Sequence, residues 1–222
     1  MSTSRLILWG GLLGLLIAGC MGARTVARTD KEKADEPGKA SLSEIQLVSG
    51  SDQQPFLVRL ETSKGDIVIE VHPEWAPRGA RRFRELVEAG FYDECRFFRV
   101  VKGFMVQVGM NGDPDFNAQW SKKKLRDDPV IQSNKPGFVT FAKTGAPDSR
   151  TTQFFINYGN NSALDRQGFA PFGKVIEGMD IAQAIESRYG EEPQQDKIER
   201  KGNAYLKNEF PKLDYIVKAT IE

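Results

Sequence analysis

Apolar and polar residues alternate in short runs along most of the chain after residue 55. Runs at 56–61 and 67–71 flank the turn-like "SKGD", a pattern typical of a hairpin. Similar runs follow at 97–108, in "FVTFAKTG", "TTQFFIN" and "PFGKVIEG", and in the closing "KLDYIVKATIE". A period of two places one face of each strand against a core and the other face outward. The pattern therefore predicts a mainly β domain.

Two segments instead carry apolar residues at helical spacing. The first, "PRGARRFRELVEAG", begins at Pro77, which fits the first turn of a helix, and Gly90 can end it. The second is the shorter "MDIAQAIESR". The polar segment between Met110 and Gly137 is too long for a simple turn and is typical of a functional or mobile connection. Many short strands with two isolated helices favour one closed antiparallel barrel over alternating strand–helix units.

The first twenty residues form a different kind of segment. Arg5 precedes an uncharged run that ends at Gly19 and is too short to cross a bilayer, which is the pattern of a secretory signal peptide. Its ending, "IAGC", resembles the lipobox of bacterial lipoproteins, in which the signal is cut before the cysteine and the lipid is attached to its sulfur. That cysteine is Cys20. The alternatives are an ordinary signal peptide with an incidental cysteine and an N-terminal membrane anchor without lipid.

Three regions follow from this composition. Residues 1–19 are the predicted signal peptide, 20–54 a lipidated cysteine with a polar tether that has no aromatic residue, and 55–222 the folded domain. We therefore expect an exported protein of the bacterial cell envelope, facing the periplasm. Cys95 is the only other cysteine, so no intrachain disulfide forms once Cys20 is lipidated.

Composition also excludes several functions. The 31 basic and 30 acidic residues give a net charge of +1, which provides no electrostatic argument for a nucleic-acid partner. His72 is the only histidine, so a zinc site of the usual type is not expected, and no nucleophile motif supports a catalytic triad. The chain also lacks phosphate-binding glycine motifs. Any catalysis must therefore proceed without a nucleophile, a metal or a histidine.

One arginine stands out among large apolar residues in "FFRVVKGFMVQVG". Rotation about an X-Pro peptide bond needs no nucleophile, because no covalent bond is broken, and its barrier of about 18–20 kcal/mol comes from amide resonance. Arg99 can stabilise the twisted amide with a planar, permanently charged donor group, while Gln107 binds the peptide backbone. The alternative is that the Arg99 stem packs along the sheet with its head in water.

Several blocks of the sequence resemble the cyclophilin family. "FFRVVKGFMVQVG" is similar to the signature F-H-R-x-x-x-x-F-M-x-Q-x-G, and "FAKTGAPDSRTTQFFIN" resembles the second signature in its bacterial form. "FGKVIEGMDI" resembles the block before the last helix. The likeness runs in order from about Phe56 to Arg188.

The resemblance implies a closed eight-stranded antiparallel β-barrel capped by two α-helices, with prolyl cis-trans isomerase activity and no cofactor or metal. It implies an enzyme that acts on Pro-containing segments. We expect these segments to belong to exported proteins and the enzyme to be a monomer. Carried over by motif, the catalytic residue is Arg99 and the substrate-binding residues are Phe104, Met105, Gln107, Ala142, Gln153, Phe155, Leu164 and Phe169.

The chain departs from the family pattern in three places. Phe98 replaces the signature histidine, and Leu164 stands where eukaryotic members carry tryptophan and many bacterial ones phenylalanine. The segment 188–216 is longer and more charged than the usual ending, and the sequence assigns it no role. A binding module that grips Pro-containing peptides without turnover remains the main alternative to an enzyme. A structural envelope lipoprotein is a more distant one.

The family's tryptophan helps to bind cyclosporin, so its replacement by Leu164 predicts weak inhibition by this drug. A fluorescence titration measures the affinity, and tight binding would contradict the prediction.

Overall fold

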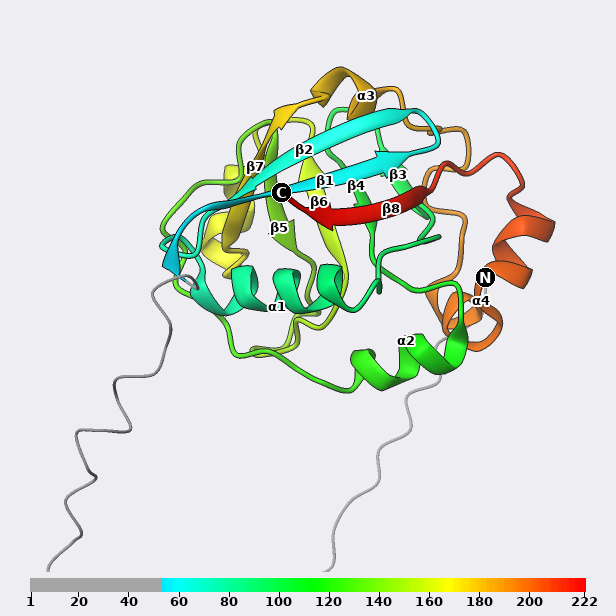
Figure 1. The fold of residues 1–222 in the computed structure, drawn as a ribbon, viewed down its shortest axis with the longest axis horizontal. Helices are drawn as coiled ribbons and strands as arrows, with labels where there is room; N and C mark the ends of the chain where they lie inside the picture. Colours follow the sequence, from blue (N-terminus) through cyan, green and yellow to red (C-terminus); the bar gives the residue numbers. More distant parts are fainter. Residues whose placement is uncertain (1–52) are drawn as a thin grey trace, which may run out of the picture. The chain divides into compact units, whose positions relative to one another are not determined.

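Eight short strands make up the framework of residues 53–222, the part of the chain described by this computed structural model (Figure 1). The strands are β1 (Phe56–Thr62), β2 (Gly65–Val71), β3 (Arg99–Val101), β4 (Met105–Val108), β5 (Phe138–Phe141), β6 (Phe154–Asn157), β7 (Pro171–Glu177) and β8 (Ile216–Ile221). The helices are α1 (Pro77–Glu88), α2 (Pro114–Ser121), η2 (Ser162–Gln167), α3 (Met179–Gln183) and α4 (Gln195–Glu209).

The predicted signal peptide, the predicted lipidation site Cys20 and nearly all of the predicted tether lie outside the described residues. Between residue 53 and the C-terminus, no helix is both long and apolar enough to span a bilayer.

The strands form one antiparallel sheet in the order β3-β4-β6-β5-β7-β2-β1-β8. The sheet curls into an open half-barrel, so the closed barrel expected from the sequence is not confirmed. Between its two ends, an isolated bridge joins Arg96 to Tyr215, just before β3 and β8 begin, and backbone hydrogen bonds link residues 94–97 to residues 214–216. Beyond that bridge, the backbone N–H of Val100 in β3 donates to the carbonyl of Gly190 at 3.0 Å. The segment before α4 therefore pairs with β3 beyond the bridge.

The main core fills the inside of the curled sheet and extends to α1. Alternate residues of the strands point inward, and α1 adds an apolar face that includes Phe83 and Leu86. The Phe83 ring contacts the rings of Phe154 and Phe172, with centroids 5.2 and 4.9 Å apart. Figure 1 shows α1 below the strands and α3 above them. Such aromatic contacts contribute beyond their buried area, and they fix α1 against the sheet.

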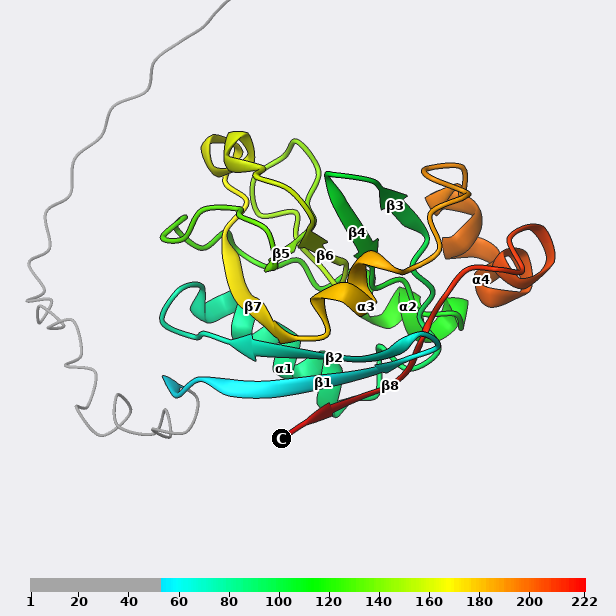
Figure 2. The same ribbon diagram turned by 90° about the horizontal axis from the view of Figure 1, so that it is seen from above.

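The structure contains two further helices of eight residues or more that the sequence analysis did not predict. Asp113 caps α2 by accepting hydrogen bonds from two backbone N–H groups of its first turn, and Pro114 begins the helix. The longer helix, α4, lies within the charged segment 188–216 and contacts α2. Figure 2 shows α4 on the same side of the domain as β3. The sequence analysis therefore predicted too few helices, since it expected two.

A second apolar cluster holds α4 in place. Its buried members come from the residue before β3, the start of the long connection, α4 and the residues just after α4: Phe98, Met110, Ile198, Tyr205, Leu206, Phe210 and Leu213. Phe98, which replaces the signature histidine, is only 1% exposed. Its apolar ring thus forms part of the apolar surface against which α4 packs.

Two glycines bring α4 close to the connection before α2. Gly202 interrupts the helix with φ 53° and ψ −139°, and a Cβ there would lie 1.9 Å from the Gly112 carbonyl oxygen. The next residue, Asn203, donates its backbone N–H to that same oxygen at 2.9 Å. Only glycine combines this close approach with a positive φ at low cost, so the kink is part of how α4 docks.

A distant carboxylate caps the N-terminus of α1, because Ala76 provides no side-chain cap. Asp128 accepts hydrogen bonds from the backbone N–H groups of Arg78 and Gly79 at 3.1 and 2.9 Å. It also accepts one from Nη1 of the buried Arg150 at 3.0 Å. A carboxylate is favoured at a helix N-terminus, so this group ties the long connection to both α1 and the strand region.

We expect Asp128→Ala to lower the free energy of unfolding by about 3 kcal/mol, because it leaves two helix N–H groups unpaired and removes a carboxylate from a buried guanidinium. Urea unfolding measures the change. The control is Asp66→Ala, which removes an ion pair whose aspartate is 51% exposed and should cost at most about 1 kcal/mol. Equal losses in the two variants would show that the cap is unimportant.

Candidate active site

The site is built on one row of residues that crosses three adjacent strands. Arg99 in β3 is the cross-strand partner of Gln107 in β4, and Gln107 is the partner of Phe155 in β6. Partners in an antiparallel ladder point to the same face of the sheet. The neighbours Val100 and Val106 point to the opposite face and belong to the core. The alternation therefore explains how an arginine occurs within an otherwise apolar stretch.

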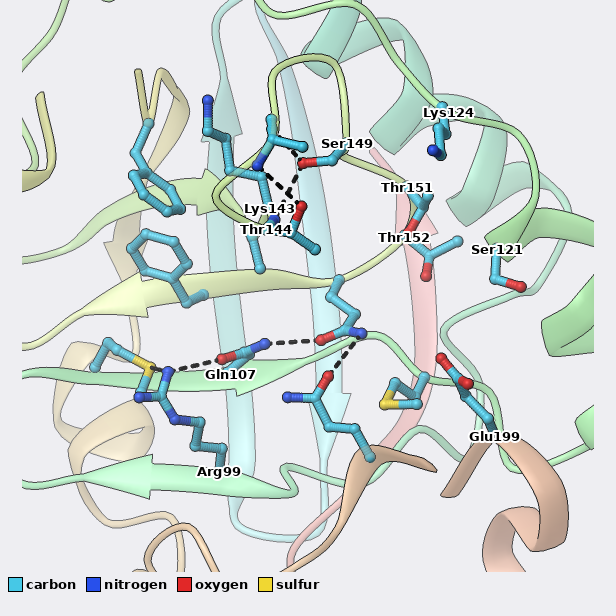
Figure 3. A pocket seen from close by; sticks show the side chains of 18 of the residues that line it. Arg99, Gln107, Ser121, Lys124, Lys143, Thr144, Ser149, Thr151, Thr152 and Glu199 are labelled. Carbon is cyan, nitrogen blue, oxygen red and sulfur yellow. Dashed lines mark hydrogen bonds between the residues drawn. The ribbon is translucent and has the colours of Figure 1, made fainter. Parts of the chain in front are cut away.

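Hydrogen bonds align the polar side chains of this row (Figure 3). Nη1 of Arg99 donates to Oε1 of Gln107 at 3.1 Å, and Nε2 of Gln107 donates to Oε1 of Gln153 at 2.7 Å. Gln153 then donates to Oε1 of Gln195 in α4 at 3.2 Å. Arg99 also bonds Glu191, with Nε and Nη2 lying 2.6 and 2.5 Å from the same carboxylate oxygen. The guanidinium is therefore held from two sides.

Apolar side chains lie beside the guanidinium. Met105 is 1% exposed and Phe155 5% exposed, and the Arg99 carbon Cζ lies 5.9 Å from the centroid of the Phe104 ring. The Phe155 ring also contacts Phe169 edge to face, with centroids 6.0 Å apart. A small apolar ring such as pyrrolidine can therefore be enclosed next to a charged donor group.

Helix η2 and the residues just after it form the side of the pocket that contains Leu164 and Phe169. Asp165 in η2 accepts hydrogen bonds from Ser133 and Asn134, which outweigh the opposing effect of burial and lower the pKa of its carboxyl group. Asn134 also donates to the Phe169 carbonyl at 2.9 Å. These bonds fix the backbone on which Leu164 and Phe169 stand.

All nine residues predicted as catalytic or substrate-binding line one pocket of about 540 Å³, a size typical of ligand sites. The backbone N–H of Ala142 donates to the Gln153 carbonyl at 2.8 Å, which leaves its own carbonyl as the group that can accept from a peptide. The structure thus brings the predicted set together, while the role of each residue stays a prediction.

The pocket also has walls that the sequence analysis did not assign. They come from the long connection, the loop after β5, the start of β6 and α4: Met110, Asn117, Ser121, Lys124, Lys143, Thr144, Ala146, Ser149, Thr151, Thr152, Gln195 and Glu199. Figure 3 shows that this part of the pocket is lined largely by polar side chains. Only the unusual length of segment 188–216 indicated in advance that α4 has any special position.

The nucleophiles and titratable groups considered from the sequence lie away from this pocket. Cys95 is fully buried in the core, and its burial, together with nearby acidic residues, raises the pKa of its thiol. The His72 ring stacks on Trp75 and lies between Glu70 and Glu74. Within residues 53–222, no group of three histidine, cysteine or acidic side chains could hold a metal ion. Of the residues considered from the sequence, Arg99, Gln107 and Gln153 are the polar groups that lie in the pocket.

Comparison with known proteins identifies the family. Residues 57–203 match the family described as cyclophilin type peptidyl-prolyl cis-trans isomerase/CLD. Peptidyl-prolyl cis-trans isomerase A of Dickeya dadantii is 38% identical over 138 residues, which cover 58% of this chain and 70% of that protein. Peptidyl-prolyl cis-trans isomerase B of Escherichia coli is 30% identical over 171 residues, covering 73% and 97%.

Solved structures agree with the fold. The crystal structure of a cyclophilin type isomerase from Cryptosporidium parvum has a TM-score of 0.56 at 22% identity, covering 76% of this chain and 98% of that one. With the matched region spanning most of the described residues, the chain belongs to the cyclophilin-type peptidyl-prolyl cis-trans isomerase family and is an enzyme of that activity.

Proposed function

We propose that the protein accelerates rotation about X-Pro bonds in exported polypeptides, with Arg99 as its catalytic residue. The observation that carries this proposal is the position of the guanidinium: its Nη1 edge enters a pocket walled by Met105, Phe104 and Phe155. A related isomerase from Cryptosporidium parvum has been crystallised in the presence of the dipeptide Ala-Pro. We infer that a proline ring occupies the apolar part of the corresponding pocket here.

The geometry suggests how the barrier is lowered. When the amide twists, the proline nitrogen regains a lone pair and becomes a hydrogen-bond acceptor. Nη1 of Arg99 donates one bond to Gln107 and makes a contact of 4.0 Å with the Met105 sulfur. Thioether sulfur is a weak acceptor, so a twisted amide nitrogen can take over that donor. About 7 kcal/mol of stabilisation in the twisted state would accelerate rotation roughly 10⁵-fold.

The peptide backbone is held by groups beside the ring pocket. We propose that Gln153 and the Ala142 carbonyl bind the residues that flank the proline, while Leu164 and Phe169 bound the ring on its outer side. A substrate fixed on both sides of the rotating bond loses less entropy in reaching the twisted state. The same surface fits an extended segment of an unfolded chain.

Export and anchoring are proposed from the N-terminal sequence. The basic start, the short apolar run and "IAGC" favour a lipoprotein signal with lipid at Cys20, so that the enzyme would act from a membrane surface of the bacterial envelope. We further propose that it acts as a monomer, because the large hydrophobic side chains exposed within residues 53–222, Ile131, Ile176 and Val217, are few and belong to separate segments.

Arg99→Ala should lower kcat/KM for isomerisation of a short X-Pro peptide by about 10²–10³-fold, the usual effect of removing one transition-state donor. NMR exchange spectroscopy measures the rate, and circular dichroism reports whether the fold is intact. Arg59→Ala is the matched control, because it removes an arginine that pairs with two carboxylates on the surface. Equal activity in both variants would refute the role of Arg99.

Mass spectrometry of the native protein should find Cys20 at the N-terminus with a lipid on its sulfur. Cys20→Ala should leave the mature protein in the soluble fraction of the envelope or keep its signal uncleaved. An unmodified Cys20 in the membrane-derived protein would exclude the lipoprotein interpretation, whatever the isomerase activity is.

A further inference from the structure

The segment 189–195 reaches the active site at two points. Glu191 pairs with Arg99 at one end of the polar row, and Gln195 accepts from Gln153 at the other end. The row therefore begins and ends on the same short segment, which lies in the part of the chain to which the sequence assigned no role.

The direction of every hydrogen bond in the row follows from Arg99. A guanidinium only donates, so the amide oxygen of Gln107 must face it and the amide nitrogen must face Gln153. The same reasoning turns the Gln153 nitrogen toward Gln195. One orientation of the arginine thus sets the orientation of each amide that is available to bind a peptide.

Glu191 binds the edge of the guanidinium that faces away from the pocket. Its carboxylate takes Nε and Nη2, whereas Nη1 faces Gln107 and Met105. Arg99 is among the residues that line the pocket, and Glu191 is not. The carboxylate therefore leaves the Nη1 edge open to substrate while it restricts rotation of the group about its long side chain.

The backbone around Glu191 is itself held firmly. The Gly190 carbonyl accepts from the Val100 N–H at 3.0 Å, next to Arg99 in the chain. The Tyr189 ring packs edge to face on Phe210, with centroids 5.2 Å apart. The backbone therefore holds the Glu191 carboxylate at a fixed position. Because Glu191 is 60% exposed, its ion pair with Arg99 adds little to overall stability.

We propose that Glu191 is a positioning residue for Arg99, and that the segment 189–195 serves to fix the catalytic row. This inference rests on the proposed catalytic role of Arg99. Long arginine side chains have many rotamers, and small misplacements of a catalytic group lower rates strongly. The carboxylate removes that freedom in the free enzyme, so that the donor is already aimed when a peptide binds.

The test compares Glu191→Ala and Glu191→Gln in the full chain, purified in mild detergent, by NMR exchange on an X-Pro peptide. Glu191→Ala should lower kcat about tenfold with KM nearly unchanged, because the donor is misaligned in the twisted state while the ring pocket is intact. Glu191→Gln keeps an acceptor oxygen at the same reach and should recover part of the loss. Glu209→Ala, at an exposed position at the end of α4 and outside this segment, should retain full activity.

A double-mutant cycle separates positioning from a general structural effect. In an Arg99→Ala background, Glu191→Ala should change kcat no further, because the group it positions is gone. A further drop there would overturn the proposal, as would unchanged or higher kcat in the single Glu191→Ala variant. If circular dichroism shows that Glu191→Ala disturbs the fold, the isosteric Glu191→Gln takes its place. Its kcat is then compared alone and in the Arg99→Ala background in the same way. Full activity of Arg99→Ala would instead refute the proposed function on which the inference rests.

Discussion

The register of β3, β4 and β6 is the constraint on which the site depends. It places Arg99, Gln107 and Phe155 in one row across three strands, with the core on the other face. A shift of one residue in any of these strands would turn that strand's contribution into the core and expose an apolar side chain in its place. The core packing that fixes the register therefore also fixes the geometry of this row.

An arginine next to an apolar pocket needs partners, because a charge that loses water without compensation is costly. Here the side chain keeps 31% of its exposure and gains Glu191 and Gln107 as acceptors. Glu191 comes from a segment that packs on Phe98 and its apolar neighbours. The second cluster, which is separate from the main core, thus bears directly on the electrostatics of the site.

Much of this arrangement could be predicted from the sequence, for physical reasons that differ between elements. The strands and α1 have clear apolar periodicity because one face of each is buried in the main core. In helix α2 only Asn117 is fully buried, and the apolar contact with the main core is limited to the partly buried Phe116 and Trp120, so the helix has only a short apolar stripe beside the signals of Asp113 and Pro114. The kink at Gly202 and the dense charge of α4 similarly conceal its apolar residues.

Contacts between distant segments were beyond the sequence analysis. The nine residues taken from the cyclophilin-like blocks all line one pocket, because strand spacing and local turns determine most of their positions. The Arg99–Glu191 pair joins residues 92 positions apart and depends on how an additional segment docks. The hydrogen bond between Gly190 and Val100 depends on the docking of the same segment.

The replacement of histidine by Phe98 and the presence of α4 are best understood together. At 1% exposure, Phe98 packs with Ile198, Leu206 and other apolar residues of this additional segment. An imidazole in that position would bury a polar ring N–H within an apolar cluster, which costs free energy when that group is left unpaired. The phenylalanine therefore favours docking of α4, and docking of α4 brings Glu191 to Arg99. A departure from the family signature beside the proposed catalytic residue thus supports the site through a neighbouring helix, without contributing a polar group to the pocket.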